Sequence, residues 1–153
     1  MIGQAKYYLG GYETASIPTQ DMYSYERKIS GTAYYNDTNP NNWIGKMGLM
    51  YVSDYGYASS NCENKKIYDN NSSSNDIRAC NGTNWLYNIK VNEWLLPQFA
   101  SRSSSAFYVN SVGDVGNNNV SNSQNGVRPV LYLISSAQIT GGNGTIGLSL
   151  IHI

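Results

Sequence analysis

Short runs of hydrophobic residues, separated by longer polar connections, recur along this chain. Residues 19–30, TQDMYSYERKIS, start with Thr19 as a candidate cap, carry Asp21 in the first turn and place Arg27 and Lys28 near the end. Acidic residues at the start and basic residues at the end of a helix both complement its dipole. This segment is therefore predicted to be a short helix.

The first eleven residues, MIGQAKYYLGG, show helical rather than alternating spacing. Ile2, Ala5 and Leu9 fall on one side, and the glycine pair at 10 and 11 would end the element. The pattern predicts the last turns of an amphipathic helix, and it lacks the charged and apolar regions of a signal peptide. Because that helix would begin abruptly at the first residue, we expect the sequence to start inside a longer protein.

The next hydrophobic run opens residues 46–60, KMGLMYVSDYGYASS, and is bounded by glycine. Such a run predicts a buried strand, and Ser53 with Asp54 then predicts the cap of a short helical turn. Residues 31–43, GTAYYNDTNPNNW, are rich in turn-forming side chains and predict a connection that leads to Trp43.

Two further elements are predicted between residues 92 and 122. Residues 92–99, NEWLLPQF, form a short apolar strand that Pro97 should stop. Residues 103–122, SSSAFYVNSVGDVGNNNVSN, alternate around Gly113 and Asp114, which predicts a β-hairpin with polar side chains at its tip and along its second strand.

The last apolar segment is residues 126–135, GVRPVLYLIS. Pro129 confines this strand to a sheet edge or to its own first residue. Arg128 is either an inward side chain satisfied by backbone carbonyls or a residue on a solvent-facing edge. Antiparallel strands that follow short helices predict the α+β class, here as a single domain over residues 1–147.

The composition favours neutral polar partners. Only 13% of the 153 residues are charged, with ten basic against ten acidic side chains, whereas Asn and Ser supply about a quarter of the chain and Tyr contributes 14 residues. Without a basic cluster we expect no nucleic-acid partner, and without 18 consecutive apolar residues we expect no membrane span. Tyr, Ser, Gly and Asn dominate binding loops. An AT-rich genome is the alternative cause of this bias.

The two cysteines, Cys62 and Cys80, bracket a polar loop with little to bury. A disulfide at the base of a loop of this length would stabilise the fold by roughly 3 kcal/mol, and it indicates an exported, oxidising location. Two reduced thiols are the alternative. Two cysteines and one histidine do not complete a zinc site, so no metal is predicted there.

Several of these motifs together resemble a known family. The ordered set WIGKMGLMYVSDYGYA, the two cysteines, NWL, EWLLP, SSSAFYVNSVGDV and GVRPVLYLISSAQITGGNGT resembles the C-terminal domain of secreted or surface proteins of gut Firmicutes, many of which begin with a prepilin-type segment. The block from EWLLP to GVRPVLYL also resembles the end of C-type-lectin-like folds, including domains similar to the formylglycine-generating enzyme. The resemblance spans residues 1–145 and implies a C-type-lectin-like domain located outside the cell or at its surface.

In lectin-like folds of this type, ligand-contacting residues tend to lie near the last hairpin. The corresponding stretch offers a flat face of hydrogen-bonding side chains on a rigid support. Its Asn-rich sequence, which adenine-rich codons would encode, also resembles retroelement-diversified receptor-binding proteins. The candidate ligand-binding residues are Arg102, Tyr108, Asn110, Asp114, Asn117, Asn118, Asn119 and Asn122. Trp85 and Trp94 join them as aromatic platforms for a sugar or anchors for a protein, although their short apolar segments favour core positions.

The chain ends with LSLIHI, where the family pattern is lost. These six residues translate back without a mismatch to CTG TCT CTT ATA CAC ATC, the transposase mosaic-end adapter of sequencing libraries. We therefore expect residues 148–153 to be an adapter-derived artefact and the domain to be truncated at both ends. A genuine apolar edge strand is the alternative. His152, the only histidine, carries no functional argument.

No catalytic residue is predicted. The carboxylates are scattered, with Asp21 and Glu26, or Asp54 and Glu93, as the pairs that a glycosidase would need, and no phosphate-binding glycine loop is present. The formylglycine-generating enzymes use cysteine chemistry in their C-terminal region, but this chain has no cysteine after Cys80. That activity is therefore not transferred with the fold.

Calcium is the remaining cofactor candidate, because sugar-binding C-type lectins coordinate both the ion and the sugar. The nearest strings, NPN at 39–41 and NEW at 92–94, depart from the lectin pattern in residue type and order. A hard cation requires several converging oxygen ligands. No cofactor is predicted, with calcium as the alternative.

The sequence thus predicts a non-catalytic ligand-binding or adhesion domain, displayed on a pilin-like or surface-anchored bacterial protein. Its expected partner is a glycan or a surface protein of a host or bacterium. The alternative is a structural pilus or surface-layer subunit without an external ligand. Further alternatives are an enzyme of the formylglycine-generating type and a retroelement-diversified receptor-binding protein.

Overall fold

The computed structural model shows an α+β fold, as predicted. It describes residues 2–9, 17–27, 42–60, 62–68, 76–88, 90–99 and 102–137. Within these ranges the helical elements are α1 (Thr19–Arg27), α2 (Val52–Tyr57) and the 3-10 helix η1 (Asp76–Cys80). The turn-rich connection as far as residue 41 and the segment 148–153 lie outside the described residues.

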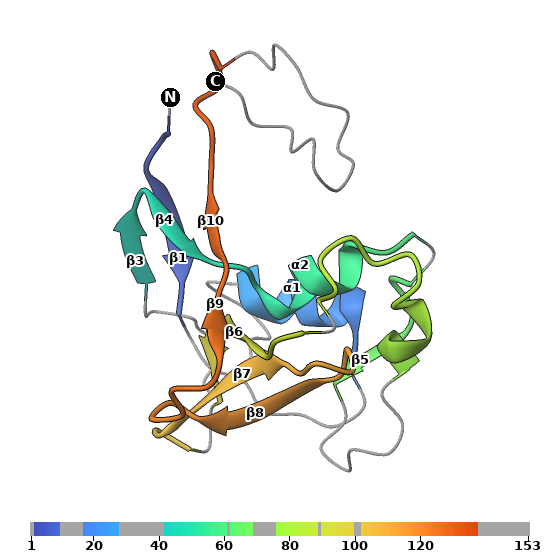
Figure 1. Cartoon of the computed structure of the whole chain (residues 1–153). Coiled ribbons are helices and arrows are strands. Elements are labelled where there is room, and N and C mark those ends of the chain that lie inside the picture. The colour runs from blue at the N-terminus through green and yellow to red at the C-terminus, as the bar shows by residue number, and fades with distance from the viewer. Residues whose placement is uncertain are drawn as a thin grey trace.

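The largest sheet has four strands in the order β8-β7-β6-β9 (Figure 1). They are β6 (Glu93–Gln98), β7 (Ser105–Val109), β8 (Val115–Asn119) and β9 (Gly126–Val127). The predicted hairpin is confirmed as the antiparallel pair β7–β8, and Gly113 turns its tip at a φ of 87° that favours glycine. Strand β9 instead runs parallel to β6.

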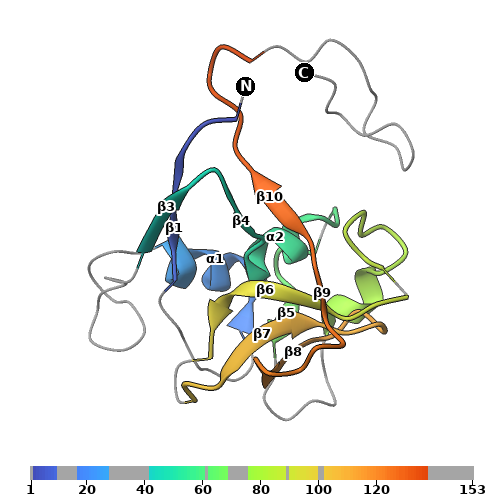
Figure 2. The same ribbon diagram turned by 60° about the vertical axis from the view of Figure 1, so that its left-hand side comes forward.

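Three two-stranded ladders are the other sheets formed by the described residues. Each pairs distant segments antiparallel: β1 (Ala5–Tyr8) with β3 (Asn42–Gly45), β4 (Met47–Leu49) with β10 (Pro129–Leu131), and β2 (Ile17–Pro18) with β5 (Lys66–Tyr68). A bridge between Ile2 and Leu133 joins the first ladder to the second. In Figures 1 and 2, α1 and α2 lie above the four-stranded sheet, and β1, β3, β4 and β10 project beyond them.

The core lies between the helices and the sheet. Met22 from α1, Tyr55 from α2 and Phe107 from β7 are fully buried there. Tyr68 meets the Phe107 ring edge-on, with 5.1 Å between the ring centroids. Gly56 allows the two helices to approach, because a Cβ at this position would lie 2.6 Å from Ile67 Cδ1 and would also meet Thr19.

The prediction of an amphipathic helix at the N-terminus is wrong, because residues 5–8 form a strand. Tyr7 is fully buried and stacks on Trp43 of β3, with 5.5 Å between the ring centroids. Aromatic side chains gain more from a cross-strand partner than from a solvated helix. The pairing with a segment far along the chain therefore overrides the helical spacing.

Two local boundaries also differ from prediction. Pro97 does not stop its strand but lies buried within β6, where the register with β7 shifts between Trp94 and Gln98. A bulge tolerates proline because the ladder is interrupted there. The apolar run from residue 47 leaves its strand at Leu49, and Met47 is 53% exposed, so this is not the buried strand predicted.

The start of α2 is set by Asp54 rather than by a cap at Ser53. Tyr51 is the N-cap residue, and its backbone N–H donates to Asp54 Oδ2 at 2.8 Å. This reciprocal arrangement resembles a capping box, in which the third helical residue reaches back to the N-cap backbone. The predicted helical turn is therefore confirmed, with its first residue at Val52.

Arg128 lies where the chain changes sheets, between β9 and β10. Pro129 is the first residue of β10, as predicted. The Arg128 guanidinium donates to Glu93 Oε1 at 2.8 Å, with both side chains partly buried. The partner of this arginine is thus a carboxylate, which differs from the backbone carbonyls predicted for an inward side chain.

The predicted disulfide between Cys62 and Cys80 is present, with 6.5 Å between the Cα atoms. No helix in the described ranges is long and apolar enough to cross a membrane.

Candidate functional site

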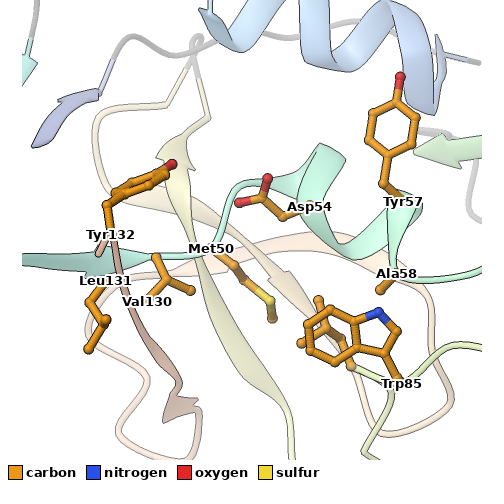
Figure 3. A pocket seen from close by; sticks show the side chains of 9 residues that line it. Met50, Asp54, Tyr57, Ala58, Trp85, Val130, Leu131 and Tyr132 are labelled. Carbon is orange, nitrogen blue, oxygen red and sulfur yellow. The ribbon is translucent and has the colours of Figure 1, made fainter. Parts of the chain in front are cut away.

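A pocket of about 360 Å³ opens between α2, the turn after η1 and strand β10 (Figure 3). In Figure 3, Tyr132 and Val130 lie on one side and Trp85 lies on the other, with Asp54 and Met50 between them. The lining residues are Met50, Asp54, Tyr57, Ala58, Trp85, Leu86, Val130, Leu131 and Tyr132.

Three aromatic side chains of this pocket remain open to solvent. Trp85 is 68% exposed, Tyr57 is 49% exposed and Tyr132 is 47% exposed. Below them the pocket has a buried apolar floor, formed by Met50, Ala58 and Leu86. An apolar concave surface with exposed aromatic rings and few polar groups is the usual form of a small-molecule site.

Trp85 is held in place by its neighbour Asn84, which is buried. The Asn84 side-chain amide donates to the Tyr55 carbonyl of α2 at 2.9 Å, and its Oδ1 accepts from the Leu86 N–H at 2.9 Å. The Trp85 backbone N–H donates to the Ala58 carbonyl at 3.3 Å. The backbone under Trp85 is therefore tied to the end of α2, and the exposed ring is carried on a fixed support.

The disulfide supports the same turn from its other side. The Cys80 carbonyl accepts from the backbone N–H groups of Thr83 and Asn84, both at 3.0 Å. The hydroxyl of buried Ser59 lies 3.3 Å from the same carbonyl and 2.6 Å from Thr83 Oγ1. The Cys62–Cys80 bond thus fixes the base of the turn that presents Trp85.

The opposite wall of the pocket comes from β10 and the residue that follows it. Pairing of β10 with β4 holds Val130 opposite Gly48. Tyr132 follows at once, and its carbonyl accepts from the Gly3 N–H at 2.9 Å. Its ring lies 5.9 Å from that of Tyr7. The wall is therefore formed by strands that are far apart in sequence.

Among the residues that the structure describes, Asp54 is the only charged one that lines the pocket. Its Oδ1 accepts from the Arg27 guanidinium at 2.8 Å, and its Oδ2 accepts from the Tyr51 backbone N–H at 2.8 Å. Its side chain keeps 35% of its surface exposed. A carboxylate offers about four acceptor positions, so Asp54 can accept further hydrogen bonds from a ligand.

Arg27 connects Asp54 to a second carboxyl group in the interior. The guanidinium lies over the Tyr51 ring at 3.7 Å and over the Tyr23 ring at 4.8 Å, which orients it by cation–π contacts. It also donates to Glu26 Oε2 at 3.0 Å and to Ser53 Oγ at 3.2 Å. The position of Asp54 is thus fixed by a network that extends from α2 into α1.

Glu26 is 1% exposed and accepts from the Ser53 backbone N–H at 3.3 Å. Burial raises the pKa of Glu26 to about 8, because desolvation penalises its charged form more than the Ser53 hydrogen bond and the Arg27 charge favour it. At neutral pH the Arg27 charge is therefore balanced mainly by Asp54. The pair forms a neutral polar edge to the pocket.

The predicted hairpin residues lie outside the lining of this pocket. Of the ten candidates, only Trp85 lines the pocket, and the core position favoured for it is wrong. Most of the predicted asparagines use their side-chain oxygens to accept from nearby backbone N–H groups. These are Asn110, which accepts from Val112 and Asp114, together with Asn118, Asn119 and Asn122.

Three other candidates have local structural contacts. The Asn117 amide donates to the hydroxyl of buried Tyr68 at 3.3 Å, so Asn117 faces inward beside Phe107. The Asp114 carboxylate lies 3.6 Å from the Arg78 guanidinium. The Arg102 guanidinium lies over the Phe99 ring at 6.0 Å.

Trp94 and Tyr108 form a small aromatic pair on the four-stranded sheet. They are directly opposite each other in the β6–β7 ladder, with ring centroids 6.2 Å apart in an edge-on arrangement. Both are half-buried. Neither lines the pocket.

Sequence reasoning missed Tyr57, Tyr132 and Asp54 as pocket residues. As a functional residue, Asp54 is weighed from the sequence only in a carboxylate pair with Glu93, but the structure pairs Asp54 with Arg27 and Glu93 with Arg128. Within the described ranges, no group of three or more His, Cys, Asp or Glu side chains could hold a metal ion. Residues 39–41, one of the weighed calcium strings, lie outside those ranges.

None of the protein-family models, curated proteins or solved structures compared with this chain matches it. The geometry of the pocket is therefore the basis for a functional argument.

Proposed function

We propose that this chain is a non-catalytic ligand-binding domain that uses the pocket between α2 and β10. The observation that carries the proposal is Trp85, a tryptophan that is 68% exposed although its backbone is anchored by buried Asn84. Leaving a large ring in water on a fixed backbone forgoes the free energy of burying it. A ligand that covers the ring would recover that free energy.

The proposed setting is a surface-displayed bacterial protein with a C-type-lectin-like domain. The Cys62–Cys80 disulfide supports an oxidising compartment outside the cytosol. The α+β architecture with early helices and a late hairpin is compatible with the lectin-like assignment. The proposed partners are glycans or surface proteins of a host or bacterium.

The test is binding of the whole chain to an array of glycans and to a panel of immobilised cell-surface proteins. Saturable binding is expected, with a loss of about tenfold or more in the Trp85→Ala variant. The matched control is Trp43→Ala, which removes another exposed tryptophan from β3, away from the pocket lining. Equal loss in both variants, or no loss in either, would contradict a binding role for the pocket.

A structural subunit is the second candidate function, and exposed apolar side chains on β3 and β4 favour it. Trp43, Ile44 and Met47 are 46%, 58% and 53% exposed on neighbouring strands β3 and β4. Such apolar side chains are typical of surfaces that neighbouring subunits cover. Analytical ultracentrifugation should then detect self-association that Ile44→Asp removes, and a strictly monomeric chain at high concentration would rule this candidate out.

A further inference from the structure

The pocket has the chemistry of a site for one ligand class. Its three exposed aromatic residues, Tyr57, Trp85 and Tyr132, can receive a ligand with a flat apolar face or a cationic group. Two small-molecule classes meet this requirement: sugar rings, whose C–H face packs on aromatic rings, and quaternary ammonium groups. The charges around the pocket distinguish them.

Asp54 does not supply an uncompensated negative charge. Its Oδ1 is 2.8 Å from the Arg27 guanidinium, and no other charged side chain in the described part of the chain lines the pocket. Arg27 also lies 3.0 Å from Glu26, but burial holds the pKa of that carboxyl near 8, so Asp54 remains the main partner of Arg27 at neutral pH. Asp54 would attract a cation in the pocket, but the adjacent Arg27 guanidinium would repel the cation and cancel most of that attraction.

Asp54 is nevertheless a suitable partner for neutral hydroxyl groups. Each of its oxygens already accepts one hydrogen bond, from Arg27 and from the Tyr51 N–H, and these contacts fix the carboxylate plane. Its remaining acceptor positions can take hydroxyl donors, and hydrogen bonds to a charged acceptor are the stronger kind. The cavity volume of about 360 Å³ lies at the small end of the usual range for ligand sites.

We propose that the pocket binds a neutral pyranose sugar, with one face of the ring on Trp85 and hydroxyl groups donating to Asp54. This inference rests on the proposed function, because it names the ligand class of the same pocket. The contacts it uses come from an aromatic ring and a carboxylate, so binding requires no metal ion. Specificity comes from hydroxyl groups that can reach Asp54 while the ring covers the indole.

The test uses the side-chain indole N–H signals of the intact chain in two-dimensional NMR. The chain has three tryptophans, so Trp43 and Trp94 serve as internal controls for Trp85 in one spectrum. Glucose, galactose, mannose and N-acetylglucosamine are titrated separately, in the presence of EDTA, and choline is titrated as the quaternary ammonium probe. At least one neutral sugar is expected to shift the Trp85 signal saturably, with the other two signals unchanged.

Three variants test the assigned contacts, with affinity measured by isothermal titration calorimetry because two of them lack the Trp85 signal. Trp85→Ala should weaken binding of that sugar about tenfold or more, and Trp85→Phe should restore part of it because an aromatic ring is retained. Asp54→Asn should weaken binding while the Trp43 and Trp94 signals keep their positions, which shows that the fold is intact. Equal affinity in Asp54→Asn would overturn the assigned hydroxyl contact.

The outcomes separate the ligand class from the pocket itself. If choline shifts the Trp85 signal and the sugars do not, the sugar assignment is wrong and the proposed binding pocket stands. If a sugar binds only without EDTA, a metal ion takes part and the assignment is also wrong. If none of the small molecules shifts the signal, the sugar assignment fails. In that case the array experiment with Trp85→Ala decides whether the pocket binds another partner.

Discussion

The pocket and the β7–β8 hairpin both carry residue types that are common in binding surfaces, but they use them differently. In the hairpin, Asn110 accepts the backbone N–H groups of Val112 and Asp114, so its side chain holds the turn in shape. In the pocket, Trp85 and Tyr57 leave about half or more of their surface exposed above a buried apolar floor. A polar side chain can contribute to recognition only through the donor or acceptor positions that the fold leaves unused.

The two regions also differ in their support. Asn84 and the Cys62–Cys80 disulfide anchor the backbone under Trp85. The hairpin tip is held by its own turn and by the side chains of Tyr55, Asn81 and Tyr87, which donate to its carbonyl groups. Both regions should therefore respond to changes in remote elements, the pocket through the disulfide and the hairpin tip through the side chains that contact its turn.

The largest expected effect comes from removing the disulfide. Replacing Cys62 and Cys80 with serine should lower the free energy of unfolding by about 3 kcal/mol, because a closed loop of this length restricts the unfolded chain. Urea unfolding measures this loss. Sugar affinity should fall as well, because the turn under Trp85 loses its base. Unchanged affinity with reduced stability would show that the disulfide does not position the ring.

The next effect is a pH dependence of stability that originates beside the pocket. The Glu26 carboxyl has an ordinary pKa of 4.5 in the unfolded chain and a pKa raised to about 8 in the folded chain. Unfolding therefore releases a proton between these values, and stability should fall as the pH rises, by at most about 1.4 kcal/mol per pH unit. Unfolding measured at pH 5 and at pH 8 tests the slope.

Glu26→Gln should remove this slope because glutamine does not titrate. The control is Asp114→Asn at the hairpin, which alters the looser 3.6 Å pair with Arg78 and should leave the slope unchanged. A slope that persists in Glu26→Gln would assign the titration to another group.

A smaller loss is expected where the two helices meet under the pocket. A Cβ at Gly56 would meet Thr19 and lie 2.6 Å from Ile67 Cδ1, so Gly56→Ala should destabilise the fold by about 1–3 kcal/mol. The matched control is Gly82→Ala, since a Cβ there has no atom within 4 Å. Thermal unfolding of both variants measures the difference, and equal melting temperatures would contradict the close packing.

The smallest effect tests the hairpin directly. Asn110→Ala removes two hydrogen bonds to the turn and should lower the free energy of unfolding by about 1 kcal/mol without changing sugar affinity. The exposed residue Asn64 gives the control variant Asn64→Ala, which should change neither quantity. A tenfold loss of sugar affinity in Asn110→Ala would show that the hairpin contributes to binding.

Elements with local signals were predictable from sequence. Helix α1 follows from Asp21 and Arg27 at its two ends, and the β7–β8 hairpin follows from alternation around Gly113. The spacing of Ile2, Ala5 and Leu9 was misleading, because Tyr7 is buried only by pairing with β3, and nothing within the first eleven residues encodes that partner. Long-range pairing therefore limited the prediction of the fold.

The site was harder to predict for the same reason. Tyr57, Trp85 and Tyr132 belong to three separate elements, and only the fold brings them to one pocket. Trp85 was recognised as a candidate, although its short apolar segment favoured the core. Asn84 distinguishes an exposed Trp85 from a core Trp85. Its buried side chain holds the backbone, and the ring of the next residue, Trp85, faces outward.

The ladder between β4 and β10 has a consequence for the order of folding. It pairs Leu49 with Pro129, so one wall of the pocket joins the others only after a contact between very distant parts of the chain. Such contacts form slowly, because closing a long loop costs entropy before any pairing compensates for it. In stopped-flow refolding, sugar binding should recover in the slowest phase, whereas recovery in the earliest phase would contradict this order. If sugar binding recovers in the slowest phase, the ability to bind sugar marks the last step of folding.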